Sequence, residues 1–261
     1  MHGLVTEPGR RHNKMSKSAR LAGRLDRFLS RDGIEQAVAS YLAPGAYTGA
    51  LFDQLSNRDD TDRYTETDFL AVSTLSVSVP PVTRQWLLGE GADYVSNLLK
   101  HIPRHRDAIV DDYDHLRSHG AAWELWYLLR QGSGMGATTT SKLMAVKRPH
   151  LVPIHDSVVS AALEIPVKNS WSTWRSYMRS RPWAESKAEI RRAADDAGGV
   201  HLSDLRVVDI VVWFTETERL KAERAKKRAA KGLKPKKAKA PCPDDLKPSE
   251  RWDGKTEGTE A

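Results

Sequence analysis

Two short segments near the middle of the chain combine residue types that can do chemistry. Gly134-Met135-Gly136 is a glycine–hydrophobic–glycine bend, and Asp156 follows it after a connection that contains two prolines. Because glycines can adopt backbone angles closed to other residues, the amide N–H groups that start the next helix are expected to face outward, where they can bind phosphate. A carboxylate such as Asp156 can stabilise a developing positive charge or orient a water molecule.

Each of these segments also has a purely structural interpretation. A glycine bend can simply allow two helices to pack closely. An aspartate in front of a helix is among the most common N-caps, which stabilise by about 1 kcal/mol without any chemistry. The sequence alone leaves both alternatives open.

Helices on both sides must position the two segments. Residues 121–129 are almost entirely apolar and are expected to form a buried helix before the bend, with Met135 filling the gap between this helix and the next. An extended connection over residues 149–155 then ends at Asp156, where another helix starts. Because neighbours on an extended chain point in opposite directions, His155 is expected to face away from Asp156.

Apolar residues at spacings of three and four predict further helices along the chain. We expect two helices within residues 16–42, broken near Asp32-Gly33, and one over residues 67–75 that is capped by Thr65 or Thr67. Pro80-Pro81 marks the end of that helix or the start of the next. The remaining helices are expected at residues 84–88, 94–102, 107–117, 171–178, 184–197 (after Pro182, closed by Gly198-Gly199) and 205–219, with residues 44–64 irregular. The β-branched runs at 72–82 and 207–212 are interpreted as buried helices, so the sequence predicts an all-α fold.

The order and spacing of Gly134-Met135-Gly136 and Asp156-Ser157-Val158 resemble a segment of helix-hairpin-helix DNA glycosylases. The resemblance covers residues 132–159, and the whole chain also looks like a group of bacterial proteins that carry this segment without an assigned function. It implies a helical glycosylase-like domain that acts in DNA repair, with Asp156 as the catalytic carboxylate. It also implies contacts to the DNA backbone from the bend and the helix that follows: Gly134, Met135, Gly136, Thr138, Thr139 and Lys142.

Departures from this family limit the expected chemistry. Lyase-competent members carry a Schiff-base lysine at the position of Thr138, eighteen residues before the aspartate, so at best a monofunctional glycosylase is expected. Lys142 lies one turn further on and is expected to be solvated or to face phosphate. The clustered cysteines of iron–sulfur members are absent because Cys242 is the only cysteine, and the histidines at 101, 105, 115 and 119 form no zinc-protease pattern. The sequence therefore predicts no metal and no other cofactor.

Excision of a base from duplex DNA requires a pocket that receives the extruded base. The walls of such a base pocket are expected to be aromatic, and the candidates, besides Trp213, are four tryptophans: Trp123, Trp126, Trp171 and Trp174. The alternative is that these rings belong to the core, where most aromatic side chains of a helical protein lie.

The formal charge of +7 is concentrated at the ends of the chain. Residues 219–240 hold eleven Lys and Arg against one acid, residues 1–31 carry +6 and residues 241–261 carry −3, which leaves residues 32–218 with −6. We therefore expect a flexible arm (1–15), a helical domain (16–218, with the hairpin motif at 121–146) and a charged, largely disordered tail (219–261). Within the tail, the Lys- and Ala-rich residues from Lys221 are expected to extend the last helix into solvent before the disorder begins. The tail is expected either to solubilise the protein or to bind nucleic acid non-specifically through Arg224, Lys226, Lys227, Arg228, Lys236 and Lys237.

Three functions are compatible with these observations. The chain could be a DNA glycosylase without lyase activity, a non-enzymatic nucleic-acid-binding module, or an interaction scaffold that holds a protein with its body and nucleic acid with its tail. The sequence has no run of about 18 apolar residues and no apolar stretch after the N-terminal basic residues. A cytoplasmic protein without a membrane partner is therefore expected, and its oligomeric state is left open.

Overall fold

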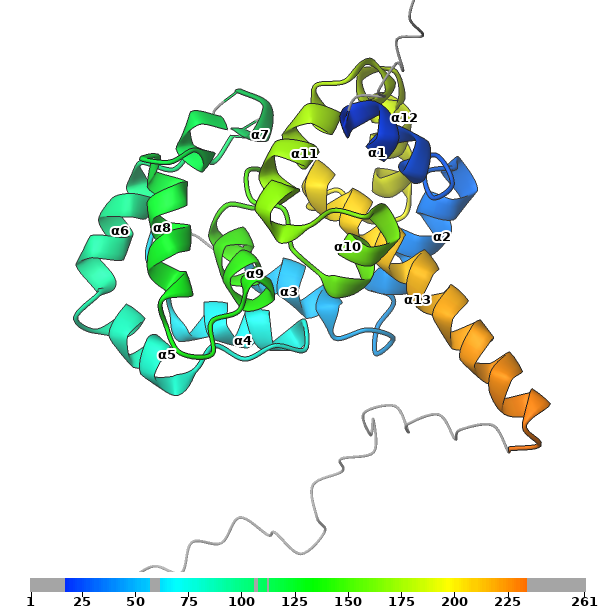
Figure 1. Cartoon of the computed structure of the whole chain (residues 1–261), viewed down its shortest axis with the longest axis horizontal. Helices are drawn as coiled ribbons and strands as arrows, with labels where there is room; N and C mark the ends of the chain where they lie inside the picture. The colour runs from blue at the N-terminus through cyan, green and yellow to red at the C-terminus, as the bar shows by residue number, and fades with distance from the viewer. Residues whose placement is uncertain (1–16, 57–61, 106–107, 112, 234–261) are drawn as a thin grey trace, which may run out of the picture.

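A computed structural model describes residues 17–56, 62–105, 108–111 and 113–233 of the chain. Within these residues the secondary structure is entirely helical, which confirms the prediction of an all-α fold (Figure 1). The elements, in chain order, are α1 (Lys17–Leu25), α2 (Arg31–Leu42), α3 (Gly49–Ser56), α4 (Glu66–Thr74), α5 (Pro81–Leu88), α6 (Ala92–Lys100), α7 (Ala108–Asp111), the 3-10 helix η1 (Tyr113–Leu116), α8 (Ala121–Arg130), α9 (Ala137–Lys147), α10 (Ser157–Leu163), the 3-10 helix η2 (Val167–Asn169), α11 (Ser170–Met178), α12 (Arg181–Asp196) and α13 (Asp204–Ala230).

The central helix of the fold is α9, which follows the glycine bend. In Figure 1 it lies between a group formed by α5, α6 and α8 and a second group formed by α1, α2, α11 and α12. Every residue of α9 from Thr139 to Lys147 is buried, so this helix has no solvated face beyond its first turn. A helix that is buried all round belongs to the interior of a protein, and here it fixes the position of the bend.

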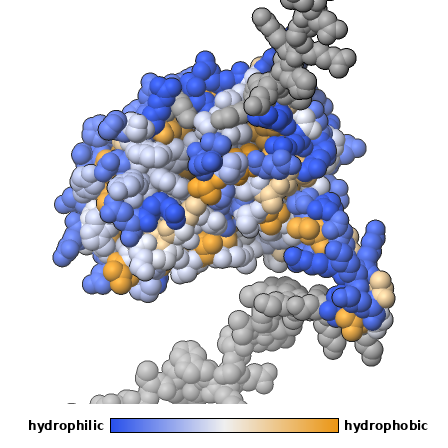
Figure 2. All heavy atoms as spheres, viewed as in Figure 1, coloured by the Kyte–Doolittle hydropathy of each residue, from blue (hydrophilic) through white to orange (hydrophobic). Residues whose placement is uncertain are grey.

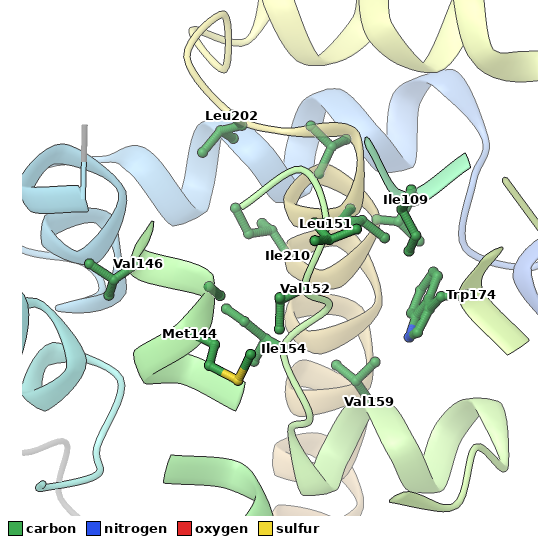
Figure 3. Close-up of a cluster of buried hydrophobic side chains, with 14 of the residues drawn as sticks. Ile109, Met144, Val146, Leu151, Val152, Ile154, Val159, Trp174, Leu202 and Ile210 are labelled. Carbon is green, nitrogen blue, oxygen red and sulfur yellow. The ribbon is translucent and has the colours of Figure 1, made fainter. Parts of the chain in front are cut away.

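The connection between α9 and α10 runs through the core. Figure 3 shows Leu151, Val152 and Ile154 on this connection, between Met144 of α9 and Ile210 of α13. All five side chains are buried. Close packing of this kind holds the connection in one conformation, so Asp156 at its end has a fixed position relative to α9 and α13.

Local signals placed several helix ends correctly. Helix α4 begins after Thr65, whose backbone N–H donates to Asp68 Oδ2 at 2.7 Å. Pro81 is the first residue of α5, where a missing N–H costs nothing. Gly198 follows α12 with φ at +89°, a left-handed conformation that favours glycine.

Other boundaries differ from the expectation. The break between the first two helices lies at residues 26–30 and not at Asp32-Gly33, because Ser30 Oγ accepts the Gly33 N–H at 3.2 Å and starts α2. Residues 44–64 were expected to be irregular but contain α3, whose Phe52 is buried in the core. Residues 75–80 form no helix, so the expected buried helix at 72–82 is wrong over most of its length.

Two further expectations need correction. Helix α8 is not buried all round, because Trp123 and Tyr127 are exposed on one face while Leu125 and Leu129 are buried on the other. Pro182 lies in the first turn of α12, after the N-cap Ser180, so it opens this helix and does not separate two helices.

Helix α13 crosses the domain boundary that was expected at residue 218. The helix predicted at residues 205–219 and the solvated helical extension predicted from Lys221 form one continuous helix that ends at Ala230. Its C-terminal part, drawn in orange, projects from the body in Figure 1 and carries mostly hydrophilic residues in Figure 2. The expected N-terminal arm and the tail beyond residue 233, with Lys236 and Lys237, lie outside the described residues.

Candidate functional site

A cavity of about 410 Å³ lies where the first turns of α9 and α10 face the N-terminal part of α13. We call it the aspartate cavity. Its wall includes three residues that the sequence singled out, Thr138, Lys142 and Asp156. Asp209 and Trp213 of α13 line it as well, together with Tyr47 from the loop before α3. The volume is within the roughly 300–1,000 Å³ typical of small-molecule pockets.

Asp156 uses its two carboxylate oxygens differently. Oδ1 accepts the Val158 backbone N–H at 2.8 Å and caps α10. Oδ2 lies 3.6 Å from Lys142 Nζ, and the side chain remains 18% exposed. The two interpretations of this aspartate are therefore compatible, because capping occupies one oxygen and leaves the other beside the lysine in the cavity wall.

Lys142 is buried, which corrects the expectation that it is solvated or faces phosphate. Its side chain is 6% exposed, and Nζ donates to the Leu75 carbonyl oxygen at 2.9 Å. Burial lowers the pKa of Lys142, and the nearby carboxylate of Asp156 opposes this effect. Thr138 and Lys142 are four residues apart on α9 and so share one helix face, which is why both line the cavity.

A buried charge network forms the floor of the aspartate cavity. The guanidinium of Arg206 donates to both oxygens of Asp53, at 2.8 Å from Nε and 3.1 Å from Nη2, and it also contacts Asp209 and the hydroxyl of Tyr41. Asp209 Oδ2 accepts from Arg206, whereas Oδ1 is buried without a hydrogen-bond partner in the described part of the chain. The pKa of Asp209 is raised to about 6 as the net result of three effects. Burial raises this pKa most, the positive charge of Arg206 lowers it, and the negative charge of Asp156 raises it.

The glycine bend lies at the surface in the form that the sequence predicted. Gly134 has φ at +79°, and Met135 is buried between α8 and α9. Two amides of the turn itself are engaged within it. The Met135 N–H donates to Gly132 O at 3.0 Å and the Gly136 N–H to Gly134 O at 3.1 Å, so the turn itself uses both.

The amides available for an anion belong to the first turn of α9. No side chain caps this helix, and the N–H groups of residues 137–139 have no hydrogen-bond partner among the residues that the structure describes. The side chains of Met135 and Thr139 are buried, so neither residue offers its side chain to a DNA backbone. Gly134, Gly136 and Thr138 remain accessible in the same region.

The four candidate base-pocket tryptophans do not line the aspartate cavity. Trp123, Trp126 and Trp171 line a second cavity of about 240 Å³, which we call the tryptophan cavity. Trp174 is buried in the core and lines neither cavity. The aromatic wall next to Asp156 instead includes Trp213, whose ring contacts that of Tyr47 edge to face at a centroid distance of 5.5 Å.

The extended connection separates the two cavities. Ile154 and Asp156 line the aspartate cavity, whereas Pro153 and His155 line the tryptophan cavity. The expected alternation of side chains is therefore present. His155 Nδ1 lies 3.0 Å from Ser160 Oγ, and the His155 backbone N–H donates to Ser141 Oγ at 2.9 Å.

The basic residues of the tail that the structure describes lie on α13. Arg224, Lys226 and Lys227 are exposed, and Arg228 is half-buried. In the described ranges no group of three His, Cys, Asp or Glu residues is placed to hold a metal ion. None of the helices described here has the length and apolar character that crossing a membrane requires.

Residues 22–216 match a family model described as a family of unknown function (DUF6308). The chain belongs to this family. The DUF6308 region includes every residue named above in the wall of either cavity, and it ends before the basic stretch that starts at Arg219. No curated protein and no solved structure matches the chain.

Proposed function

We propose that this protein binds DNA and removes a damaged or mismatched base, as a glycosylase that hydrolyses the N-glycosidic bond in the aspartate cavity. The observation that carries the proposal is the placement of Asp156, whose Oδ2 faces an aromatic-walled cavity while Oδ1 caps α10. The likeness of the bend and the aspartate to helix-hairpin-helix glycosylases supports the same activity. It also supports a helix-hairpin-helix glycosylase-like arrangement of α8, the bend and α9.

In this proposal Asp156 acts on the sugar. As the bond between C1′ and the base breaks, positive charge develops on the deoxyribose, and a nearby carboxylate stabilises it. The oxygen of a water molecule then bonds to C1′ while Asp156 Oδ2 accepts a proton from that water. Thr138 occupies the position at which lyase-competent helix-hairpin-helix glycosylases carry their Schiff-base lysine. We therefore propose no cleavage of the DNA strand.

The departing base needs a proton, and in this proposal it comes from Asp209, which lines the same cavity. The electron pair of the broken bond goes to the base nitrogen, which takes the proton of the Asp209 carboxyl group. A pKa near 6 keeps part of the Asp209 population protonated at neutral pH, and its Oδ1 has no other hydrogen-bond partner in the described residues. After the product leaves, Asp209 regains a proton from solvent, and Asp156 releases to solvent the proton that it accepted from the attacking water.

Two features of the surface would hold the nucleic acid. The partnerless amides of residues 137–139 give a helix N-terminus that attracts a phosphate group. The exposed basic residues of α13 add non-specific attraction, which the acidic body does not supply. Trp213 and Tyr47 give the extruded base aromatic surface to stack against.

The decisive experiment is base release by the full-length protein and by Asp156→Asn. The substrates are duplexes that each carry uracil, an alkylated purine, an oxidised purine or a mismatch, and free base is measured by chromatography. Asparagine caps helices as well as aspartate, so the variant removes the charge and keeps the start of α10. We expect release to fall at least about 100-fold. Asp93→Asn, which changes an exposed acid of α6, is the matched control and should leave release unchanged.

A second candidate is a nucleic-acid-binding module without catalysis. The pairing of Lys142 with Asp156 favours it, because an ammonium group at 3.6 Å already balances the carboxylate. In that case no substrate releases a base, and binding persists in Asp156→Asn. Binding that depends on the first turn of α9 would then define the function.

A further inference from the structure

The tryptophan cavity has the features of a ligand site separate from the aspartate cavity. The walls of this cavity come from α8 and α11, through Trp123, Trp126 and Trp171. Its floor comes from Pro153 and His155 of the extended connection. At about 240 Å³ it is smaller than the roughly 300–1,000 Å³ of pockets for drug-sized molecules. A single flat ring system suits this space.

The tryptophan rings leave aromatic surface for such a ring. Trp171 contacts Trp123 and Trp126 at centroid distances of 6.2 and 5.3 Å, with interplanar angles of 82° and 71°. In edge-to-face pairs of this kind one ring presents only its edge, so its faces stay free to stack. Trp123 remains 39% exposed although it belongs to this cluster. A ring that enters the cavity covers apolar surface that is now open to water.

Two polar groups in the wall can hydrogen-bond the edge of a flat ring. Burial lowers the pKa of His155, which favours its neutral imidazole; Nδ1 is engaged with Ser160, while Nε2 has no partner in the described residues. Ser170 is 6% exposed, and its hydroxyl has no hydrogen-bond partner among those residues either. Neutral donors and acceptors in an aromatic site select an uncharged ring with polar edges.

The charge of the wall excludes one alternative ligand. Tryptophan clusters also bind quaternary ammonium ions, but a cation gains from neighbouring carboxylates. Among the described residues that line this cavity there is no Asp or Glu, and the charged side chain is Lys168 of η2. Lys168 repels a cation and attracts an anionic group attached to the ring. The preferred ligand is therefore a flat, neutral ring with a phosphate beside it.

We propose that the tryptophan cavity binds the base of an unpaired nucleotide, with the base against Trp171 and Trp123 and its phosphate near Lys168. The site lies on the other side of the connection from Asp156, so a base held there is bound without excision. The proposal does not depend on glycosylase activity.

The test is a titration of the full-length protein with adenosine 5′-monophosphate, followed by tryptophan fluorescence and by saturation-transfer NMR of the ligand protons. Ribose 5-phosphate supplies the phosphate without the base, and choline supplies a cation. We expect the nucleotide to bind and both comparison compounds to bind at least tenfold more weakly. Equal binding of ribose 5-phosphate, or tighter binding of choline, would overturn the proposal.

Variants locate the bound base. Stacking of a base on an aromatic ring is worth about 1–3 kcal/mol by alanine substitution, so Trp171→Ala should weaken nucleotide binding about tenfold or more. Trp171→Phe keeps an aromatic ring and should restore most of the affinity, which separates loss of stacking from loss of folding. Trp86→Phe, in α5, should change nothing. If Trp213→Phe weakens binding and Trp171→Ala does not, the base binds in the aspartate cavity and this proposal fails, whereas the proposed excision is not contradicted.

Discussion

Lys142 Nζ and Asp156 Oδ2 lie 3.6 Å apart in the wall of one cavity, although the two residues are fourteen positions apart in the chain. The buried helix α9 holds the lysine, and the packed connection that follows holds the aspartate. This pair connects the helix that follows the glycine bend with the start of α10. It gives Asp156 a second interaction besides the N–H that its Oδ1 caps.

Replacing Lys142 with methionine tests the pair. Lys142→Met keeps much of the side-chain volume but removes the donor to Leu75 O and the positive charge 3.6 Å from Asp156 Oδ2. We expect the free energy of unfolding to fall by about 1–3 kcal/mol, because Leu75 O loses its donor and Asp156 loses its ion-pair partner. In a double-mutant cycle with Asp156→Asn, measured by urea denaturation, the coupling should be about 0.5 kcal/mol or more. Lys100→Met at an exposed site of α6 is the control, and an equal loss there would contradict a specific pair.

The raised pKa of Asp209 should make both the stability and the activity of the protein fall as the pH rises through about 6. Its folded-state pKa of about 6 is higher than the ordinary value of 3.8, so folding favours the protonated form, and this contribution is lost as the pH rises from about 4 through 6. Asp209→Asn stays neutral, so its stability relative to wild type should increase over that range, as urea denaturation at pH 4, 5, 6 and 7 can measure. If Asp209 donates the proton to the base, wild-type base release should also decline as the pH rises above 6. A stability difference that is constant with pH would show that Asp209 titrates normally.

Gly134 and Gly136 form a matched pair of substitutions in the bend. Gly134 has φ at +79°, and an added Cβ would lie 3.0 Å from Pro80 Cγ, whereas a Cβ at Gly136 would meet nothing within 4 Å. We expect Gly134→Ala to cost about 1–2 kcal/mol because L-residues rarely adopt this conformation. Gly136→Ala should cost less than half as much. Thermal unfolding of both variants measures the difference, and equal melting temperatures would contradict the left-handed turn.

The basic part of α13 should control the salt dependence of DNA binding. Changing Arg224, Lys226 and Lys227 to Gln removes three exposed charges outside the cavities. The slope of log K against log salt should become shallower by up to about 2.7, since each phosphate contact contributes about 0.9. Fluorescence anisotropy with one duplex at several salt concentrations gives this slope. An unchanged slope would mean that these residues do not touch DNA.

Short-range signals in the sequence predicted much of the fold. Thr65, Pro81 and Gly198 mark helix ends through local effects, which are a capping box with Asp68, a proline ring in the first turn and a left-handed backbone conformation. The bend and the opposite orientations of His155 and Asp156 follow from equally local geometry. These features do not depend on where the rest of the chain goes.

The aspartate cavity could be predicted only in part, because distant residues complete it. Arg206 contacts Asp53 and Tyr41 across 153 and 165 positions of the chain, and no local pattern links these three residues. Lysine side chains are usually solvated, so nothing near Lys142 indicates that Leu75 and α13 bury it. The tryptophans were candidates for a ring-binding wall, but only the tertiary structure separates Trp213 from Trp123, Trp126 and Trp171.

Helix α13 is one continuous rod of 27 residues, about 40 Å long, that carries both Asp209 and the basic stretch at Arg224. The orientation of these two groups about the rod axis is therefore set by residue count alone. Inserting a single residue between Lys221 and Arg224 would rotate the basic stretch around the axis by about 100° and keep the contacts of Glu218 and Lys221 with Tyr47 in the cavity wall. A series of insertions of one, two and three residues would therefore show from which side of the helix a polyanion approaches.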